Sequence, residues 1–199
     1  MIHGSKILVI IGSTRARRIC PQIAEWVAKI GRETIAGDIE VVDLKDWPLP
    51  MDDEPNIPAG VPKLGDYANE HTHAWSGKIA AANAVVFVTP QYNWGYPAPL
   101  KNALDHLYNE WSGKPAMIVT YGSRGGNKCA TQLRQVLDGL HMKPVATMVG
   151  FKLPRPHIEA NTGTIDPATQ FASHVKTLKR AYAELSAALS GKTRKFWGW

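Results

Sequence analysis

A short segment that follows the first apolar run of the sequence has the residue types that bind phosphate. It contains a glycine, two hydroxyl side chains and three arginines, in the order Gly12, Ser13, Thr14, Arg15, Ala16, Arg17, Arg18. Glycine lets a ligand approach the backbone closely, and backbone N–H and hydroxyl groups donate hydrogen bonds to phosphate oxygens. Arginine can donate two parallel hydrogen bonds to the same phosphate. The segment matches neither Gly-x-x-x-x-Gly-Lys nor Gly-x-Gly-x-x-Gly, so it indicates neither ATP hydrolysis nor a dinucleotide fingerprint. The competing interpretation is an ordinary capped turn with surface arginines.

Two later segments combine flat side chains with an approachable backbone. The first has two prolines, an asparagine and three aromatic rings, in the order Thr89, Pro90, Gln91, Tyr92, Asn93, Trp94, Gly95, Tyr96, Pro97. The second has three glycines, in the order Tyr121, Gly122, Ser123, Arg124, Gly125, Gly126. Such residues suit a flat ring with a polar edge. A core loop or dimer contact in the first segment, and a flexible turn in the second, are the alternatives.

All three segments come directly after runs that are long enough to be strands. Apolar, β-branched runs occupy 7–11, 39–42, 85–89, 117–121 and 145–149, and helical patterns occupy 22–35, 67–82, 99–111, 130–140 and 168–189. This alternation predicts an α/β flavodoxin-like three-layer sandwich around a five-stranded parallel sheet, in the order 2-1-3-4-5. The three segments then end the first, third and fourth strands and converge on one crevice, where ligands bind in such folds.

The composition indicates a single domain over residues 1–199, in which the tail after 191 is expected to be flexible. The chain has 44% hydrophobic residues and no second domain or repeat. Its two cysteines, Cys20 and Cys129, form no disulfide scaffold or metal motif, and its early apolar run is too short to span a membrane. We therefore expect a cytoplasmic protein that binds neither metal nor membrane. Two irregular stretches, 46–62 and 153–167, have no role that the sequence reveals.

The net charge of +6 has two interpretations. Its basic residues are scattered, and the motifs that bind nucleic acid are missing, so we expect no nucleic-acid partner. A mild positive field also suits small anionic substrates such as dinucleotides.

Together, the three segments resemble the NADPH-dependent FMN reductase family, and most closely its small fungal quinone reductases. The longest match extends from Pro90 to Asp105, and the resemblance covers roughly residues 6–140. It implies FMN as cofactor and NAD(P)H as co-substrate. The phosphate would be held at Ser13 and Arg15, assisted by Arg17, Arg18 and backbone N–H groups near Ile19. The isoalloxazine would lie against Pro90, Gln91, Tyr92, Asn93 and Trp94, with Tyr121 and Gly122 on its other side, and Gly125 and Gly126 would also contact the cofactor. Many members have Glu at the position of Gln91 and a Ser close to Arg18, so the complete phosphate site stays open.

The implied activity is transfer of hydride from NAD(P)H through FMN to a quinone or similar acceptor by a ping-pong mechanism. The cofactor carries this chemistry, so no catalytic residue is expected. Trp94, Tyr96 and His106 are the candidates for contact with substrate. Flavin, azo dyes or metal complexes are alternative acceptors. A flavodoxin-type electron carrier and an FMN redox-switch binding protein are rival functions, although carriers are typically acidic and this chain is basic.

The family resemblance also implies a homodimer, or in some members a tetramer. The segment 99–111 carries Tyr108 and Trp111 in addition to its apolar stripe. Additional aromatic rings on a helix often face a second copy of the chain. We therefore expect these two residues to contribute to a dimer interface.

Overall fold

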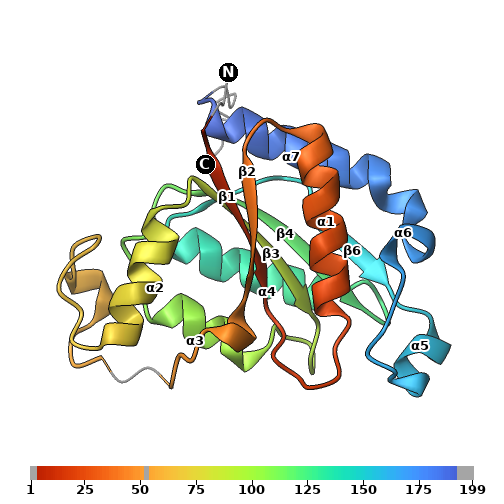
Figure 1. The fold of residues 1–199 in the computed structure, drawn as a ribbon, viewed down its shortest axis with the longest axis horizontal. Helices are drawn as coiled ribbons and strands as arrows, with labels where there is room; N and C mark the ends of the chain where they lie inside the picture. The colour runs from red at the N-terminus through yellow and green to blue at the C-terminus, as the bar shows by residue number, and fades with distance from the viewer. Residues whose placement is uncertain (1–3, 52–53, 192–199) are drawn as a thin grey trace.

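The computed structural model describes residues 4–51 and 54–191 (Figure 1). The tail that the sequence predicts to be flexible, after residue 191, lies outside the described residues. Helices flank a central sheet, and the carboxyl ends of its main strands share one edge (Figure 1). Within the described parts of the chain, no helix is long and apolar enough to cross a membrane.

The sheet has the predicted parallel order, with one additional strand. Its strands are β1 (Lys6–Ile11), β2 (Asp38–Asp43), β3 (Ala84–Pro90), β4 (Pro115–Gly122), β5 (Lys143–Pro144) and β6 (Val149–Lys152). They follow the order β2-β1-β3-β4-β5, and β6 also pairs with β4. The order 2-1-3-4-5 is therefore confirmed, and the prediction of five strands is wrong by one.

The additional strand arises because the predicted strand 145–149 is interrupted. Val145 still donates its N–H to the Ala116 carbonyl, 2.8 Å away. Two residues later, the Thr147 N–H donates instead to the Glu184 carboxylate of the last helix, at 2.8 Å. That bond takes the backbone off the β4 ladder until Val149 rejoins it opposite Val119.

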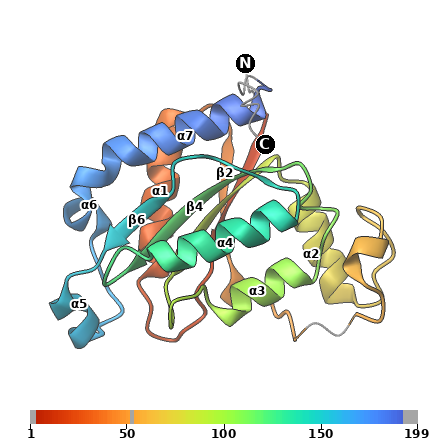
Figure 2. The ribbon, with the colours of Figure 1, turned by 180° about the vertical axis from the view of Figure 1, so that it is seen from behind.

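Helices cover both faces of the sheet, as Figures 1 and 2 show from opposite sides. They are α1 (Cys20–Thr34), α2 (Glu70–Ala80), α3 (Ala98–Asp105), α4 (Asn127–Gly139), α5 (Arg155–Ala160), α6 (Pro167–Gln170) and α7 (Val175–Leu189), with short 3-10 turns at Leu44–Asp46, Pro58–Gly60 and Ala172–His174. Alternate residues of β1 face opposite layers. Ile7 and Val9 pack in the core beneath α1 and α7, whereas Leu8 and Ile10 pack in the core beneath α2, α3 and α4.

Three predicted helices are shorter in the structure. The pattern over 67–82 is reduced at both ends to α2. The pattern over 99–111 becomes α3, which ends at Asp105. The Leu104 carbonyl accepts from Leu107 N and from the indole Nε1 of Trp111, rather than from the residue four positions later as a continuing helix requires. The pattern over 168–189 divides into α6, a 3-10 turn and α7. The break lets Phe171 stack on Phe151 with ring centroids 4.6 Å apart.

Candidate cofactor-binding site

The carboxyl ends of four strands meet at one edge of the sheet, and backbone hydrogen bonds hold their loops together. Gly12 N, just after β1, donates to the β3 carbonyl of Val88 at 2.9 Å. Gln91 N, just after β3, donates to the β4 carbonyl of Tyr121 at 2.9 Å. Leu153 N, just after β6, donates to the β4 carbonyl of Gly122, also at 2.9 Å. The predicted convergence of the three segments is thereby confirmed at the level of the backbone.

A pocket of about 450 Å³ opens at this edge. Its lining includes residues that the sequence predicts for the cofactor, namely Arg15, Arg17, Arg18, Ile19, Pro90, Gln91, Tyr92, Tyr121 and Gly122. It also includes residues that the sequence analysis missed, namely Ser123, Leu153, His157, Ile158, Asn161 and Gly163. Most of the missed residues belong to α5 and its flanks, within the stretch 153–167. The one available signal was the length of that stretch, since long loops in compact domains are often functional.

The first loop is packed closely at its start and open further along. A methyl group on Gly12 would lie 2.8 Å from Thr89 Oγ1, so only glycine fits there. Ser13 is fully buried, and its Oγ lies 2.8 Å from the Tyr92 hydroxyl. Its hydroxyl is therefore turned toward Tyr92. Arg15 and Arg17 are exposed at the pocket.

Arg18 is bound to an acidic partner that the sequence analysis did not identify. Its guanidinium donates two hydrogen bonds to the Asp43 carboxylate, at 2.7 and 2.6 Å, and a third to the Ser13 carbonyl. The bond to Asp43 raises the pKa of Arg18 further. Because Asp43 ends β2, this ion pair joins the loop after β1 to the neighbouring strand. Arg18 thus lines the pocket with most of its donors already engaged.

The loop after β3 is a tight two-residue turn. Tyr92 and Gly95 exchange backbone hydrogen bonds of 2.8 and 2.9 Å. Between them, Asn93 and Trp94 have φ values of 45° and 74°, the pattern of a type I′ turn. This conformation costs a side chain as large as Trp about 1–2 kcal/mol. The loop is therefore held rigidly, and Trp94 points outward with 62% of its surface exposed.

Gln91 anchors the same loop to the start of α4. Its Oε1 accepts hydrogen bonds from Lys128 N at 3.1 Å and from Cys129 N at 3.2 Å. These are N–H groups of the first helical turn, which otherwise have no partner within the helix. Gly126 precedes the helix with φ of 77°, where a methyl group would lie 2.8 Å from Thr120 Cβ. Gly122 and Gly126 therefore bracket a loop that lies close to Gln91.

Tyr121 lines the pocket, and both it and the buried Cys20 with which it interacts stay neutral. Burial raises the pKa of Cys20 to about 12, although a hydrogen bond with Tyr121 opposes this. Burial also raises the pKa of Tyr121 well above its usual value, and the neighbouring Cys20 adds to the shift. A protonated, buried thiol is a poor nucleophile. Cys20 and Tyr121 therefore contribute packing and a hydrogen bond rather than covalent chemistry.

The three predicted substrate contacts do not meet at this pocket. Trp94 lies outside it, with Lys128 Nζ 5.2 Å from its ring centroid. Tyr96 is half-buried against the core, and burial, followed by the nearby Asp105, raises its pKa to about 12. His106 is fully buried, with Nε2 3.0 Å from the Pro50 carbonyl and Nδ1 3.3 Å from Thr72 Oγ1. In this structure His106 therefore fastens the loop after β2 to α3.

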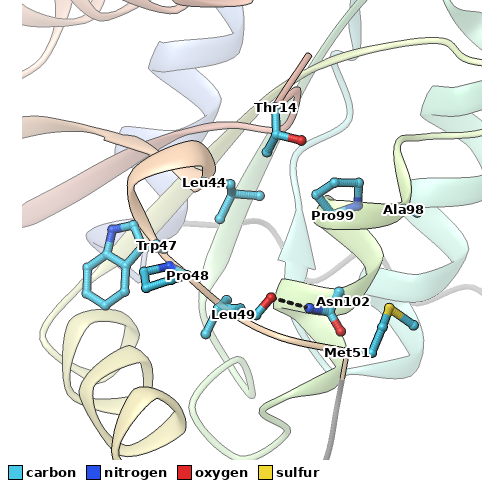
Figure 3. Close-up of a pocket in the computed structure, with 9 residues that line it drawn as sticks. All are labelled: Thr14, Leu44, Trp47, Pro48, Leu49, Met51, Ala98, Pro99 and Asn102. Atoms are coloured by element: carbon cyan, nitrogen blue, oxygen red, sulfur yellow. Dashed lines mark hydrogen bonds between the residues drawn. The ribbon is translucent and has the colours of Figure 1, made fainter. Parts of the chain in front are cut away.

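A second cavity, of about 320 Å³, is lined by Thr14 of the first loop together with the loop after β2 and the start of α3 (Figure 3). Its lining is Thr14, Leu44, Trp47, Pro48, Leu49, Met51, Ala98, Pro99 and Asn102. Asn102 Nδ2 donates to the Leu49 carbonyl at 3.2 Å and holds the loop after β2 against α3 (Figure 3). None of these described lining residues is charged. The arginine-lined pocket is therefore the better match for an anionic ligand.

The arginine-lined pocket has two chemically different parts. Arg15 and Arg17 lie on the loop after β1, and Pro90, Tyr121 and Gly122 lie at the ends of β3 and β4. Guanidinium groups suit a phosphate, whereas aromatic and glycine-rich walls suit a flat ring. Its volume falls within the range of about 300–1,000 Å³ that ligand pockets usually have. Fold and site together define a flavodoxin-like protein whose site fits a flat-ringed nucleotide.

Comparison with known proteins agrees with this class. Residues 5–152 match the model of the NADPH-dependent FMN reductase family. An NAD(P)H-dependent FMN reductase of Schizosaccharomyces pombe is 53% identical over 181 residues, covering 91% of this chain and 88% of the relative. An NADPH:quinone oxidoreductase of Arabidopsis thaliana is 30% identical over 197 residues, covering 94% of each chain. The chain therefore belongs to the NADPH-dependent FMN reductase family.

Among solved structures, the flavoenzyme NAD(P)H:acceptor oxidoreductase FerB of Paracoccus denitrificans is similar in fold. The two structures superpose with a TM-score of 0.70 at 20% sequence identity. The match covers 94% of this chain and 98% of FerB. The predicted flavodoxin-like fold is thereby confirmed.

Proposed function

We propose that this protein is an FMN-dependent NAD(P)H oxidoreductase that reduces quinones or similar flat acceptors. The observation that carries the proposal is the pocket itself, in which arginines line one part and aromatic and glycine residues line the other. Family membership and the activities for which the two relatives are named agree with it. The basic net charge of +6 also favours an enzyme for anionic dinucleotides over an acidic electron carrier.

In this proposal Arg15 and Arg17 bind the FMN phosphate. Both are exposed on the loop after β1, whereas Arg18 is engaged with Asp43 and Ser13 is buried against Tyr92. The ring part of FMN then lies among Pro90, Gln91, Tyr121 and Gly122. Of the five residues that the resemblance implies for the phosphate, we therefore assign direct contact to the side chains of Arg15 and Arg17 alone. Backbone N–H groups of the same loop complete the site.

When bound, FMN supplies a ring that accepts two electrons from NAD(P)H and passes them to the acceptor. The protein binds and orients both partners. The described lining shows one pocket of about 450 Å³ that joins the two parts of the site, and α5 contributes His157 and Ile158 to its wall. We infer that nicotinamide and quinone use the same space in turn, which makes the reaction ping-pong.

Analysis of the purified protein tests the proposal. Bound flavin should give a yellow protein, and heat release followed by chromatography should identify FMN. Addition of NAD(P)H without an acceptor should bleach the flavin, and a quinone should restore its colour. Recovery of FAD, or a flavin that NAD(P)H does not bleach, would overturn the proposal.

We further propose that the protein is a homodimer and acts in the cytoplasm. Large apolar side chains are exposed at Met51 (80%), Ile57 (80%) and Trp94 (62%), and such surfaces often mark contacts between proteins. Trp111, in contrast, is fully buried in its own core, so its predicted place in a dimer interface is wrong. Two free thiols, Cys20 and Cys129, support a reducing compartment.

A further inference from the structure

We infer that Tyr92 is a positioning residue that links the phosphate part of the site to the ring part and sets the preference for FMN over riboflavin. The inference rests on the proposed function, because it assumes that the pocket binds a flavin. It differs from the role that the family resemblance implies for this residue, which is contact with the isoalloxazine.

The side chain of Tyr92 is directed at the loop after β1. Its hydroxyl lies 2.8 Å from Ser13 Oγ, and the Arg15 guanidinium carbon lies 3.5 Å from the centre of its ring. One aromatic side chain from the β3 loop therefore contacts two neighbours on the β1 loop. The contact with Arg15 lies at the part of the pocket that suits a phosphate, and Ser13 is buried two residues earlier in the same loop.

Tyr92 can restrict the positions of these neighbours because its own backbone is fixed by hydrogen bonds. Its N–H and carbonyl both pair with Gly95 in the tight turn. Ser13, the partner of its hydroxyl, is fixed from the opposite direction, because Arg18 donates to the Ser13 carbonyl and is clamped by Asp43. A chain of contacts therefore runs from the β3 loop through the β1 loop to the end of β2.

The Tyr92 ring restricts the side chain of Arg15, which is exposed and would otherwise sample many rotamers. A guanidinium stacked on an aromatic face loses part of that freedom before the ligand arrives, which lowers the entropic cost of binding. The phosphate then meets an arginine that is already oriented. Riboflavin has the same ring and no phosphate, so its binding does not depend on this orientation.

Fluorescence titration of the apoprotein with FMN and with riboflavin tests the inference. Tyr92→Leu removes both the ring and the hydroxyl, and should lower the ratio of FMN to riboflavin affinity by about 2- to 30-fold. Tyr92→Phe keeps the ring over Arg15 and should retain most of that ratio. In an Arg15→Ala background, Tyr92→Leu should change the ratio no further, because the residue acts through Arg15.

Trp94→Leu is the matched control, since Trp94 lies in the same turn and outside the pocket. It should change the affinities for FMN and riboflavin by the same factor.

An unchanged ratio in Tyr92→Leu would overturn the inference and leave the proposed function intact. Tighter FMN binding by Tyr92→Leu would also overturn it, by showing that the tyrosine occupies the place of the phosphate. If the unmodified protein binds neither flavin, the proposed function itself fails. Should Tyr92→Leu not fold, Tyr92→Met gives a second test, because it also removes the aromatic face under Arg15. It should lower the ratio in the same direction, and an unchanged ratio there would overturn the inference.

Discussion

Arg18 and Asp43 form a bidentate salt bridge that joins the loop after β1 to the end of β2. The two hydrogen bonds measure 2.7 and 2.6 Å, and the side chains are only 11% and 17% exposed. Water competes weakly for such a pair, and parallel N–H···O bonds fix its geometry. The same arginine holds the Ser13 carbonyl, so the ion pair shapes the backbone at the candidate phosphate site.

Asp43→Asn should therefore reduce the stability of the protein. Loss of the charged acceptor leaves a largely buried guanidinium poorly paired, which we expect to cost about 1–3 kcal/mol of unfolding free energy. Urea unfolding of the apoprotein measures this. Glu159→Gln is the control, because its ion pair with Arg155 has side chains that are 61% and 88% exposed and should contribute little. Equal effects of the two substitutions would contradict the role given to Asp43.

Arg15→Ala should weaken FMN binding by about 10- to 150-fold, the range for loss of a charge-assisted hydrogen bond. The apoprotein should unfold at an unchanged temperature, because Arg15 is exposed. Titration of the apoprotein with FMN gives the dissociation constant. Lys29→Ala removes the same charge from an exposed position on α1 and should leave the constant unchanged. A normal dissociation constant for Arg15→Ala would refute the phosphate assignment.

Substitutions of Gln91 should separate stability from redox tuning. Gln91→Leu removes the acceptor for Lys128 N and Cys129 N, and should cost about 0.5–2 kcal/mol, as loss of a helix cap does. Gln91→Glu keeps the acceptor and adds a negative charge at a helix N-terminus, which should stabilise the apoprotein by about 0.3–1 kcal/mol. The same charge beside a bound flavin should lower its midpoint potential, because reduction adds negative charge. A potential that does not change in Gln91→Glu would place the flavin away from this side chain.

Steady-state kinetics should reveal a site shared by donor and acceptor. Double-reciprocal plots against NAD(P)H at several quinone concentrations should give parallel lines, and high quinone should compete with NAD(P)H. Ile158→Ala, in the α5 wall of the pocket, should raise KM for the acceptor about tenfold. Met148→Ala, an exposed apolar residue that lines a different cavity, should leave it unchanged. Intersecting lines would establish a ternary complex and reject the shared site.

The oligomeric state should depend on exposed rather than buried aromatic residues. If a homodimer forms through the exposed apolar surface, Trp94→Glu should shift it toward monomer in light scattering while the fold is retained. Trp111→Glu should instead prevent folding, because it places a charge in the core where the indole now donates to the Leu104 carbonyl. An unmodified protein that is monomeric at micromolar concentration would remove the dimer proposal.

The fold and the location of the site were predictable because they depend on local patterns. Apolar runs such as 7–11 form strands buried on both faces, and parallel strands with helical connections have few arrangements available. The segments after β1, β3 and β4 therefore had to converge. In contrast, the interrupted strand at 145–149 depends on Glu184, which lies in a helix 37 residues further along the chain.

The amino-acid sequence alone thus determined the fold class, the three converging loops and the presence of arginines beside a flat, aromatic segment. Only the tertiary structure decided how these side chains pair. Arg18 meets Asp43 across 25 residues, Ser13 meets Tyr92 across 79, and α5 closes the pocket from beyond the segment that matches the family. The physical reason is that strand and helix patterns arise from interactions between neighbours in sequence. Side-chain pairing at a site depends instead on distances that exist only once the sheet has brought its strands together.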